Sequence, residues 1–479
     1  MITIGIDFGT TTISGSVLDI QVSGSETAVQ RHPVFQPQLL YASTVPNDSF
    51  LPPDVPGARI QNTEKILSLG QNLLEKLLAF CEAETSEPPD AIGLTGQMHG
   101  IVYTDDAGRP LSPLYTWQDL RGGSVRDQIL EKTGIPVPAG YGLATHYYNM
   151  THGLVPEGAV SLCTIMDLAG MRLTGTCRPR MHMTTAASLG FFDTAKKEFM
   201  DEALAALFSA SDGSGETGSG SDALIPEFSE EIQVIGSFRG IPVTCAIGDN
   251  QAGVLASIGT ALGIPLVNFG TGGQVSLLSD RYSELPGIET RPFLPGFYLM
   301  AGSSLCGGRA YAILERFFRS YAADAGAPEE PQYALMNVLA EKALQQEAAE
   351  PPGSTQEPGD LLSVSPLFCG TRMDPSLRGS VTGISDTNFT PGALILGTLR
   401  GMADELYGYY SEMVSLFPNR VRPDRVVGSG NGLRKNPVLH KLVAERFGAP
   451  LELSPFEEEA ACGAAISAAM GLLCAASSS

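Results

Sequence analysis

The tripeptide Phe-Gly-Thr occurs twice, at residues 8–10 and 269–271, and each copy follows a run rich in β-branched residues. In the first copy, isoleucines alternate with other residues from Ile2 to Ile6, and the alternation resumes after the turn. This period of two predicts a β-hairpin with a Gly-Thr tip. The same strand–turn–strand pattern begins again at residue 264. The repeat therefore predicts that the chain contains two halves of similar construction.

The length of the chain is consistent with two halves, because 479 residues exceed what one ordinary core accommodates and suggest two domains of about 200–250 residues. The apolar spacing of residues 63–83 predicts a helix capped at Thr63, and residues 91–96 predict a buried strand. Alternating strands and helices indicate an α/β fold. We place the domain boundary near residue 250, which gives domains 1–249 and 250–479.

Charge limits the class of partner. The formal net charge is −22 and the basic residues form no run, so nucleic acid and an anionic membrane are not expected partners. Eight cysteines without a C-x-x-C pair predict reduced, buried thiols in a reducing compartment. The acidic Asp7 near the N-terminus and the lack of an uninterrupted apolar run of about 18–20 residues predict a cytoplasmic protein. Two stretches rich in Gly, Ser, Glu and Pro, 209–222 and 350–360, are expected to be surface insertions.

The two Gly-Thr turns are candidates for phosphate binding. A hairpin tip made of Gly and Thr exposes several N–H groups and hydroxyls in one concavity, which can hold a phosphate chain without a lysine. One such turn alone is more often an ordinary hairpin tip. Two turns at equivalent points of two halves favour a pair of phosphate loops.

Asp249 is the candidate catalytic base. It lies in GDNQAG, residues 248–253, between an apolar strand and an apolar helix. The structural alternative for an Asp at this position is a helix N-cap. The chemical interpretation is a carboxylate, ionised at pH 7, that orients an alcohol and accepts its proton during phosphoryl transfer.

A polyol site is predicted from two further motifs. Gln97, Met98 and His99 lie between two glycines in a turn that joins two predicted strands. Trp117, the only tryptophan of the chain, is followed closely by Asp119. An amide, an imidazole, a carboxylate and a flat aromatic ring suit a polyol, because each sugar hydroxyl requires donor and acceptor partners. The alternative is a set of unrelated strand ends.

A Gly-rich turn occurs again in residues 426–448, between a predicted strand and a predicted helix. The motif is weak evidence for a dinucleotide-binding fold, because the spacing G-x-G-x-x-G is absent. An adenosine lying on the glycines and on the helix N-terminus fits equally well.

Taken in order, these motifs resemble the FGGY carbohydrate kinases of the actin-like ATPase superfamily. The resemblance extends over nearly the whole chain and rests on IDFGTTT (6–12), GQMHG (96–100), WQDLR (117–121), MDLAGMRLTG (166–175), IGDNQAG (247–253), NFGTGG (268–273), RMDPSLRG (372–379), GSGNG (428–432) and EEEAACGAAISAAMG (457–471). It implies an α/β fold of two ribonuclease-H-like domains with an interdomain cleft. In such a cleft the two hairpins bind the ATP phosphates from both sides.

The resemblance also implies the role of each candidate residue. Asp7 would hold Mg²⁺ through water, and Asp249 would be the catalytic base. The remaining assignments are Thr10, Thr11 and Thr12 in the first phosphate loop; Gly270, Thr271 and Gly272 in the second; Gln97, Met98, His99, Trp117, Asp119 and Asn250 at the sugar; and Gly428, Gly430 and Asn436 at the adenosine, with Asn431 as the competing register for the last.

The expected activity is an ATP- and Mg²⁺-dependent phosphorylation of a terminal hydroxyl of a ketose. Within the family the motifs are most similar to those of members that act on sedoheptulose, with xylulose as the alternative substrate. Small residues in 140–149 and 302–308 are expected to leave room for the longer sugar. A non-catalytic sensor of sugar or nucleotide is the alternative from another class, and the oligomeric state is left open.

Overall fold

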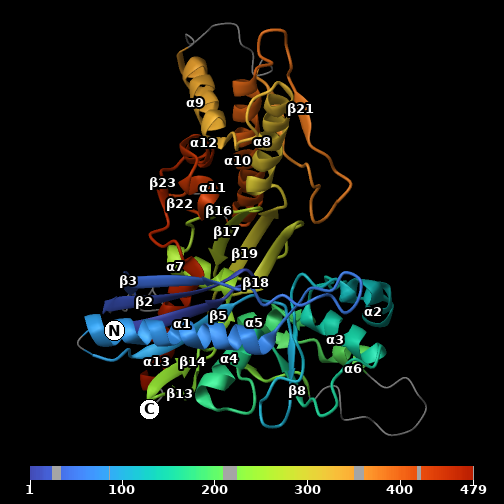
Figure 1. Ribbon diagram of the computed structural model, residues 1–479, viewed down its shortest axis with the longest axis vertical. Helices are drawn as coiled ribbons and strands as arrows, with labels where there is room; N and C mark the ends of the chain where they lie inside the picture. Colours follow the sequence, from blue (N-terminus) through green and yellow to red (C-terminus); the bar gives the residue numbers. More distant parts are fainter. Residues whose placement is uncertain (24–33, 86, 209–223, 350–360, 418–421, 478–479) are drawn as a thin grey trace. The chain divides into compact units, whose positions relative to one another are not determined.

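The computed structural model describes residues 1–23, 34–85, 87–208, 224–349, 361–417 and 422–477, so both predicted insertions lie outside the described residues. The chain divides into two compact units (Figure 1). Unit 1 contains residues 1–260, 291–297 and 458–479, and unit 2 contains residues 261–290 and 298–457.

This division differs from the expected boundary at 249/250 in two respects. Unit 1 also contains α7 (Asp249–Ile258) and the C-terminal α13 (Glu459–Ser477), and the chain returns to it for the short segment Arg291–Phe297. The physical reason for the first difference is packing, because α13 lies against the central strands of the unit 1 sheet and against α7.

The sheet of unit 1 has the order β3-β2-β1-β5-β14-β13, and β15 also pairs with β5. The first three strands along the chain are antiparallel neighbours, whereas β5 is parallel to β1 and β14 is parallel to β5. These strands are β1 (Ile2–Phe8), β2 (Thr12–Ser23), β3 (Val34–Pro46), β5 (Ala91–Gly96), β13 (Val234–Phe238), β14 (Ile241–Thr244) and β15 (Ile247–Gly248).

Glycines allow a helix to approach this sheet closely. A Cβ added to Gly5 would lie 1.9 Å from the Ala461 carbonyl oxygen of α13, and one added to Gly93 would lie 1.9 Å from that of Ala464. Gly15, which pairs with Ile6, faces the other way, toward leucines of α1 (Thr63–Glu84). Because side chains alternate along a strand, α13 and α1 cover opposite faces of the sheet.

The other elements of unit 1 are short, and all but α4 (Ile165–Thr174), which packs against β5 and β13 of the sheet, surround a second apolar core that includes Leu143, Leu189 and Leu207. They are β4 (Ile60–Gln61), β6 (Val102–Thr104), β7 (Leu114–Tyr115), the 3-10 helix η1 (Arg121–Val125), α2 (Arg126–Thr133), α3 (Gly142–Thr151), β8 (Ser161–Cys163), α4 (Ile165–Thr174), β9 (Met181–His182), α5 (Met183–Ala187), β10 (Phe192–Asp193), β11 (Glu198–Phe199), α6 (Asp201–Phe208) and β12 (Phe228–Ser229).

Unit 2 repeats the strand arrangement of unit 1 in a sheet with the order β18-β19-β17-β16-β22-β23, in which β18 is an additional edge strand. Strands β16 and β17 form an antiparallel hairpin, and β19 is antiparallel to β17. On the other side, β22 is parallel to β16 and β23 is parallel to β22. The strands of this unit are β16 (Leu266–Phe269), β17 (Gly273–Ser279), β19 (Tyr298–Ser304), β20 (Ser363–Ser365), β21 (Ser380–Thr382), β22 (Val426–Ser429) and β23 (Leu451–Leu453), and β18 (Ile288–Pro292) ends in the segment assigned to unit 1. The prediction of two similar halves is therefore confirmed.

The helices of unit 2 pack on this sheet around a core that contains Phe269, Leu399 and Leu439. They are α8 (Gly307–Asp324), α9 (Tyr333–Ala349), α10 (Pro391–Ser415), α11 (Gly430–Arg434) and α12 (Pro437–Phe447). The 25 residues of α10 begin after a Thr390 cap, whose side chain accepts a hydrogen bond from the N–H of Ala393.

Most local expectations are confirmed, with corrections in detail. The strand predicted at 91–96 is β5, and the helix predicted at 63–83 is α1, but its cap is Asn62 rather than Thr63, since the Asn62 side chain accepts from the N–H of Lys65. Five of the eight cysteines are buried as expected, whereas Cys369 is half-buried and Cys177 and Cys474 are exposed. One described helix, α13, has the length and composition of a membrane span over Glu459–Ala476, and 61% of that window is buried in the structure.

Candidate active site

The first Gly-Thr turn, between β1 and β2, has its carbonyl groups bound from behind. Asn47 Nδ2 donates to the Gly9 carbonyl at 2.8 Å, Gln61 Nε2 donates to the Thr10 carbonyl at 2.8 Å, and the Asn47 N–H donates to the Thr11 carbonyl at 2.8 Å. Every described peptide bond is trans, so the N–H group that follows each carbonyl points in the opposite direction. The turn therefore directs a row of N–H groups away from its support, as an anion-binding loop requires.

The second Gly-Thr turn, between β16 and β17, is supported in the same way by a helix. The N–H groups of Gly308 and Arg309, in the first turn of α8, donate to the carbonyls of Gly270 and Thr271, each at 2.9 Å. The N–H groups of Thr271 and Gly272 consequently point away from α8. The two copies of the tripeptide thus have the same construction, although different elements provide the support.

Close packing explains the glycines of residues 302–308. A Cβ on Gly307 would lie 2.2 Å from the backbone of Gly272, one on Gly308 would lie 2.6 Å from the Gly270 carbonyl oxygen, and one on Gly302 would lie 2.4 Å from Tyr409. These small residues were expected to leave room for a long sugar. Instead they allow α8 and α10 to approach the second loop and its sheet.

Side chains of the predicted sugar motifs contact the first loop. Thr10 Oγ1 donates to Gln97 Oε1 at 3.3 Å and accepts from Trp117 Nε1 at 3.0 Å, and Gln97 Nε2 donates to Gln61 Oε1 at 2.8 Å. Gln61 and Gln97 are buried, whereas Trp117 is exposed. The structure therefore brings the first loop and the sugar motifs together within unit 1.

Two carboxylates of unit 1 act on a third, Asp7. Burial raises the pKa of Asp7 to about 8, with further increases from the charges of Asp249 and Glu458. Burial also raises the pKa of Asp249 to about 6, opposed by the Asn250 N–H, which donates to Asp249 Oδ1 at 2.7 Å, and by the positive charge of Arg291. Asp249 is the first residue of α7, after a Gly248 cap, so its carboxylate lies at the favourable end of the helix dipole.

Asp7 has the properties of a cation ligand. Its Oδ1 atom is buried and has no hydrogen-bond partner, so the carboxylate lacks the compensation that buried charges normally receive. Within the described residues, no group of three or more His, Cys, Asp or Glu side chains is arranged to hold a metal. Mg²⁺ keeps several water ligands and is commonly bound through one or two carboxylates and substrate phosphates, so Asp7 fits as its protein contact.

The GQMHG turn lies beside the residue that precedes Asp249. A Cβ added to Gly248 would lie 2.6 Å from Met98 Sδ, so the backbone in front of Asp249 packs directly on Met98. His99 adopts a φ of 72°, a conformation that residues other than glycine seldom adopt. Its Nδ1 lies 2.8 Å from the Ser188 carbonyl, which can only accept, so a neutral ring carries its proton on Nδ1 and presents Nε2 as an acceptor.

Asn250 has a partner that the motifs did not reveal. Arg291 Nη1 donates to Asn250 Oδ1 at 3.3 Å, and the Gln251 side chain donates to the Pro292 carbonyl at 3.1 Å. Phe293 is buried. These contacts show why the segment 291–297 belongs to unit 1, where it brings a guanidinium to the beginning of α7.

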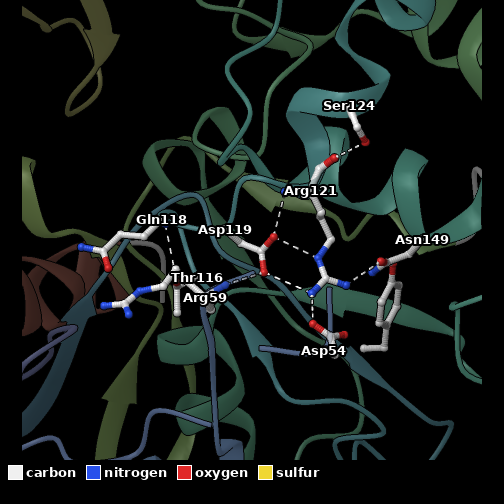
Figure 2. A network of polar contacts seen from close by, with 9 residues as sticks. Asp54, Arg59, Thr116, Gln118, Asp119, Arg121, Ser124 and Asn149 are labelled. Atoms are coloured by element: carbon white, nitrogen blue, oxygen red, sulfur yellow. Dashed lines mark hydrogen bonds and ion pairs between the residues drawn. The ribbon is translucent and has the colours of Figure 1, made fainter. Parts of the chain in front are cut away.

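Both carboxylate oxygens of Asp119 bind protein groups (Figure 2). Its Oδ1 accepts from Arg121 N–H at 3.0 Å and Nε at 2.9 Å, and its Oδ2 accepts from Arg59 N–H at 3.0 Å and Arg121 Nη2 at 3.2 Å. The Asp119 and Arg121 side chains are fully buried, and the guanidinium also donates to Asp54 and Asn149. Asp119 was expected at the sugar; in the structure both of its oxygens bind Arg121, and Oδ2 also binds the backbone N–H of Arg59, which precedes β4.

The segment 140–149 is also mostly interior. Seven of the ten residues of α3 are buried, and Asn149, besides accepting from Arg121, donates to the Tyr103 hydroxyl at 3.3 Å. Tyr141, which precedes α3, is different, because its ring stacks on His99 with 4.2 Å between ring centroids. Of the segment expected to measure sugar length, Tyr141 thus contacts the GQMHG turn through its ring, while Gly140 and Gly142 pack against the backbone carbonyls of Trp117 and His99.

The Gly-rich turn of unit 2 packs against the second hairpin. A Cβ on Gly430, which has a φ of 82°, would lie 2.7 Å from the Phe269 carbonyl oxygen, and Gly428 lies in β22 against Leu433 and Leu451. Asn436 is buried as the cap of α12, where its Oδ1 accepts from the Leu439 N–H at 3.0 Å. Asn431, the competing register, is exposed in α11.

The candidate residues thus form one group in each unit. Unit 1 holds Asp7, the first loop, the sugar motifs, Asp249 and Asn250, and unit 2 holds the second loop and the Gly-rich turn. The sequence analysis missed Asn47, Gln61 and Arg291. No local pattern identifies them, because each is distant along the chain from the residue that it supports. Glu458 lies in the motif 457–471, but its effect on the pKa of Asp7 was not predicted.

Two duplicated α/β sheets, each opening with a Gly-Thr hairpin whose carbonyls are bound from behind, give the chain a two-domain fold with one candidate phosphate loop in each unit. Comparisons with known proteins agree. Residues 2–256 match the N-terminal domain of the FGGY family of carbohydrate kinases, and residues 266–472 match its C-terminal domain. The chain belongs to the FGGY family of carbohydrate kinases.

Relatives with different substrates match this chain. It is 27% identical to a sedoheptulokinase of Homo sapiens, over 97% of this chain and 96% of that protein. It is 23% identical to a xylulose kinase of Haemophilus influenzae, over 79% of this chain and 74% of that protein. The crystal structure of xylulose kinase from Rhodospirillum rubrum has the same fold, with a TM-score of 0.76 at 21% identity, covering 98% of this chain and 90% of that one.

Proposed function

We propose that this kinase transfers the γ-phosphoryl group of ATP to the terminal hydroxyl of sedoheptulose, giving sedoheptulose 7-phosphate and ADP. The observation that carries the proposal is the convergence in unit 1 of Asp249, Asp7 and the GQMHG turn, since Met98 packs on the backbone before Asp249 and the Asp249 charge raises the pKa of Asp7. A base, a cation ligand and a sugar motif in one place are the parts that phosphoryl transfer to an alcohol needs.

In this proposal Asp249 accepts the proton of the attacking hydroxyl. The Asn250 N–H and the Arg291 charge favour the ionised form of Asp249 and oppose the effect of burial on its pKa. Asp7 would hold Mg²⁺, which when bound neutralises the charge on the phosphates. The N–H groups that follow the carbonyls of Gly9, Thr10 and Thr11 in the first loop, and those of Thr271 and Gly272 in the second, would donate to phosphate oxygens.

The sugar-binding residues that we propose are Gln97, Met98, His99, Trp117 and Asn250. His99 is held by a hydrogen bond with Ser188 and by stacking on Tyr141, which positions the ring to contact a sugar hydroxyl. Asn250 is oriented by Arg291. We do not place Asp119 at the sugar, because both of its oxygens bind Arg121. Gly428 and Gly430 remain the proposed adenosine contacts, whereas the buried capping role of Asn436 makes exposed Asn431 the better candidate.

Sedoheptulose is proposed over xylulose because the sedoheptulokinase relative matches this chain over almost the whole of both proteins. A site built for seven carbons leaves polar groups unpaired when a five-carbon sugar binds. We therefore expect kcat/KM for sedoheptulose to exceed that for xylulose by about 10²-fold or more. Steady-state kinetics on sedoheptulose, xylulose, ribulose, fructose and glycerol test this. A preference for xylulose, the second candidate because several relatives carry that name, would replace the substrate and keep the kinase.

Thr271→Val should weaken ATP use and leave sugar use unchanged. Thr271 is exposed at the tip of the second loop, and the substitution removes its hydroxyl with little change in volume. Because a hydrogen bond to a charged group contributes about 1.5–3 kcal/mol, KM for ATP should rise roughly 10- to 100-fold. Thr271→Ser is the matched control and should stay near wild type. A rise in sugar KM with unchanged ATP kinetics would show that this turn is not a phosphate loop.

A further inference from the structure

Thr10, Gln61 and Gln97 form a closed ring of hydrogen bonds. Gln61 Nε2 donates to the Thr10 carbonyl, Gln97 Nε2 donates to Gln61 Oε1, and Thr10 Oγ1 donates back to Gln97 Oε1. Trp117 Nε1 adds a fourth bond, to Thr10 Oγ1. We call these four residues the Thr10 network.

The orientation of both amides is determined by the Thr10 network. The Thr10 carbonyl can only accept, so Gln61 must present its nitrogen to the loop and its oxygen to Gln97. Gln97 must then present its nitrogen to Gln61 and its oxygen to the Thr10 hydroxyl. Turning either amide by half a rotation would place two donors or two acceptors face to face in a buried position, where unsatisfied polar groups are costly.

Gln61 has no role in the proposed chemistry and lies in the two-residue strand β4. Its side chain is fully buried and joins the loop backbone to the amide of Gln97. The Thr10 carbonyl that it holds belongs to the same peptide unit as the Thr11 N–H, so this contact sets the direction of a donor proposed to bind phosphate.

We propose that Gln61 is a positioning residue of this kinase, which orients the first phosphate loop and connects it through Gln97 to the sugar-binding turn. The inference rests on the proposed function of the Gly-Thr loop as a phosphate site. It assigns no contact between Gln61 and either substrate. Its effect reaches the reaction through the Thr10 carbonyl and the Gln97 amide.

Trp117 offers a direct readout of the network. It is the only tryptophan of the chain, its side chain is 46% exposed, and its indole N–H is bonded to Thr10. A non-hydrolysable ATP analogue that engages the Thr10 loop should therefore change the emission of Trp117. This measurement requires neither sugar nor turnover.

The test is Gln61→Met, which has similar size but cannot form either hydrogen bond, with Gln38→Leu as the control at an exposed position of β3. Gln61→Met should raise the Kd for the ATP analogue, measured by calorimetry, about 10-fold or more, and should reduce the response of Trp117 emission. Gln38→Leu should change neither. A Kd within twofold of wild type and an unchanged emission response in Gln61→Met would overturn the proposal.

A second variant, Thr10→Val, tests the Thr10 network in case Gln61→Met does not fold. Thr10→Val removes the hydroxyl that joins Gln97 and Trp117. It should change the emission of Trp117 without ligand and weaken the binding of the ATP analogue. If Thr10→Val left both the emission of Trp117 and the affinity for the ATP analogue unchanged, the proposed role of the Thr10 network would be overturned as well. Failure of the kinase proposal is distinguishable, because a wild-type protein that binds the analogue but phosphorylates no sugar contradicts the activity and leaves the loop measurement interpretable.

Discussion

Asp249→Asn should lower kcat for sugar phosphorylation by about 10²- to 10⁴-fold, the contribution typical of a positioned general base. The Asn side chain keeps the shape of the carboxylate and its position at the start of α7, so nucleotide and sugar should still bind. Coupled measurement of sugar-dependent ADP release gives kcat, and calorimetry gives the two affinities.

The matched control is Asp106→Asn, at an exposed Asp of unit 1, which should retain wild-type kcat. The pH profile adds a second check, since burial raises the pKa of Asp249 to about 6. The base must be ionised to accept a proton, so kcat/KM of the wild type should be at its plateau above that pKa and fall as pH decreases through about 6. A variant that keeps near wild-type kcat would remove Asp249 from the mechanism.

Asp119→Ala should destabilise unit 1 by about 3–5 kcal/mol, the usual effect of removing one partner from a buried ion pair. Arg121 is buried with Asp119, and its remaining carboxylate partner, Asp54, is partly exposed. The substitution therefore leaves a buried guanidinium with incomplete compensation. Urea unfolding followed by the emission of Trp117, two residues from Asp119, reports the loss.

Asp54→Ala provides the contrast, because it removes the exposed partner of the same guanidinium. Pairs that involve an exposed side chain contribute about 0–1 kcal/mol, so the unfolding midpoint should shift much less than in Asp119→Ala. Enzyme kinetics decide whether Asp119 has a structural role or binds the sugar. If Asp119→Ala unfolded at the wild-type midpoint while the sugar KM rose steeply, the carboxylate would be a sugar ligand and the structural assignment would be wrong.

Local patterns were sufficient to predict the duplicated hairpins. The alternation around residues 2–17 and its recurrence at 264 follow from the pleat of a strand, which each segment expresses independently of distant residues. The strand at 91–96 and the helix at 63–83 were found for the same reason. The predicted helix cap, Thr63, is one residue from the cap in the structure, Asn62. Both residue types are suitable caps, and tertiary contacts decide between them.

The division of the chain was not predictable from local patterns, because it depends on contacts over several hundred residues. α13 joins unit 1 because Gly5 and Gly93 admit its backbone, and neither end of the chain alone indicates that fit. The return of the segment 291–297 to unit 1 was not predictable for the same reason. Arg291 looks like an ordinary residue of a strand until its contact with Asn250 is seen.

Residue types identified the candidate site better than they identified individual roles. Asp119 was expected at the sugar because a carboxylate beside a tryptophan suits a polyol, but its partner is Arg121, two residues later. Gln97 was placed at the sugar as well, and its amide also belongs to the Thr10 network. A sequence shows which groups can form hydrogen bonds, whereas only the fold decides which partners are near enough to use them.

The most direct test of the central claim is detection of the product. Purified protein, ATP and Mg²⁺ are incubated with sedoheptulose, and the phosphorus signals of the mixture are followed by NMR in the presence and absence of the sugar. The account predicts a sugar phosphate monoester and ADP that appear in equal amounts, only when the sugar is present, and that are lost in Asp249→Asn. ADP without a sugar phosphate, or no turnover with sedoheptulose or any of the other sugars tested, would contradict it.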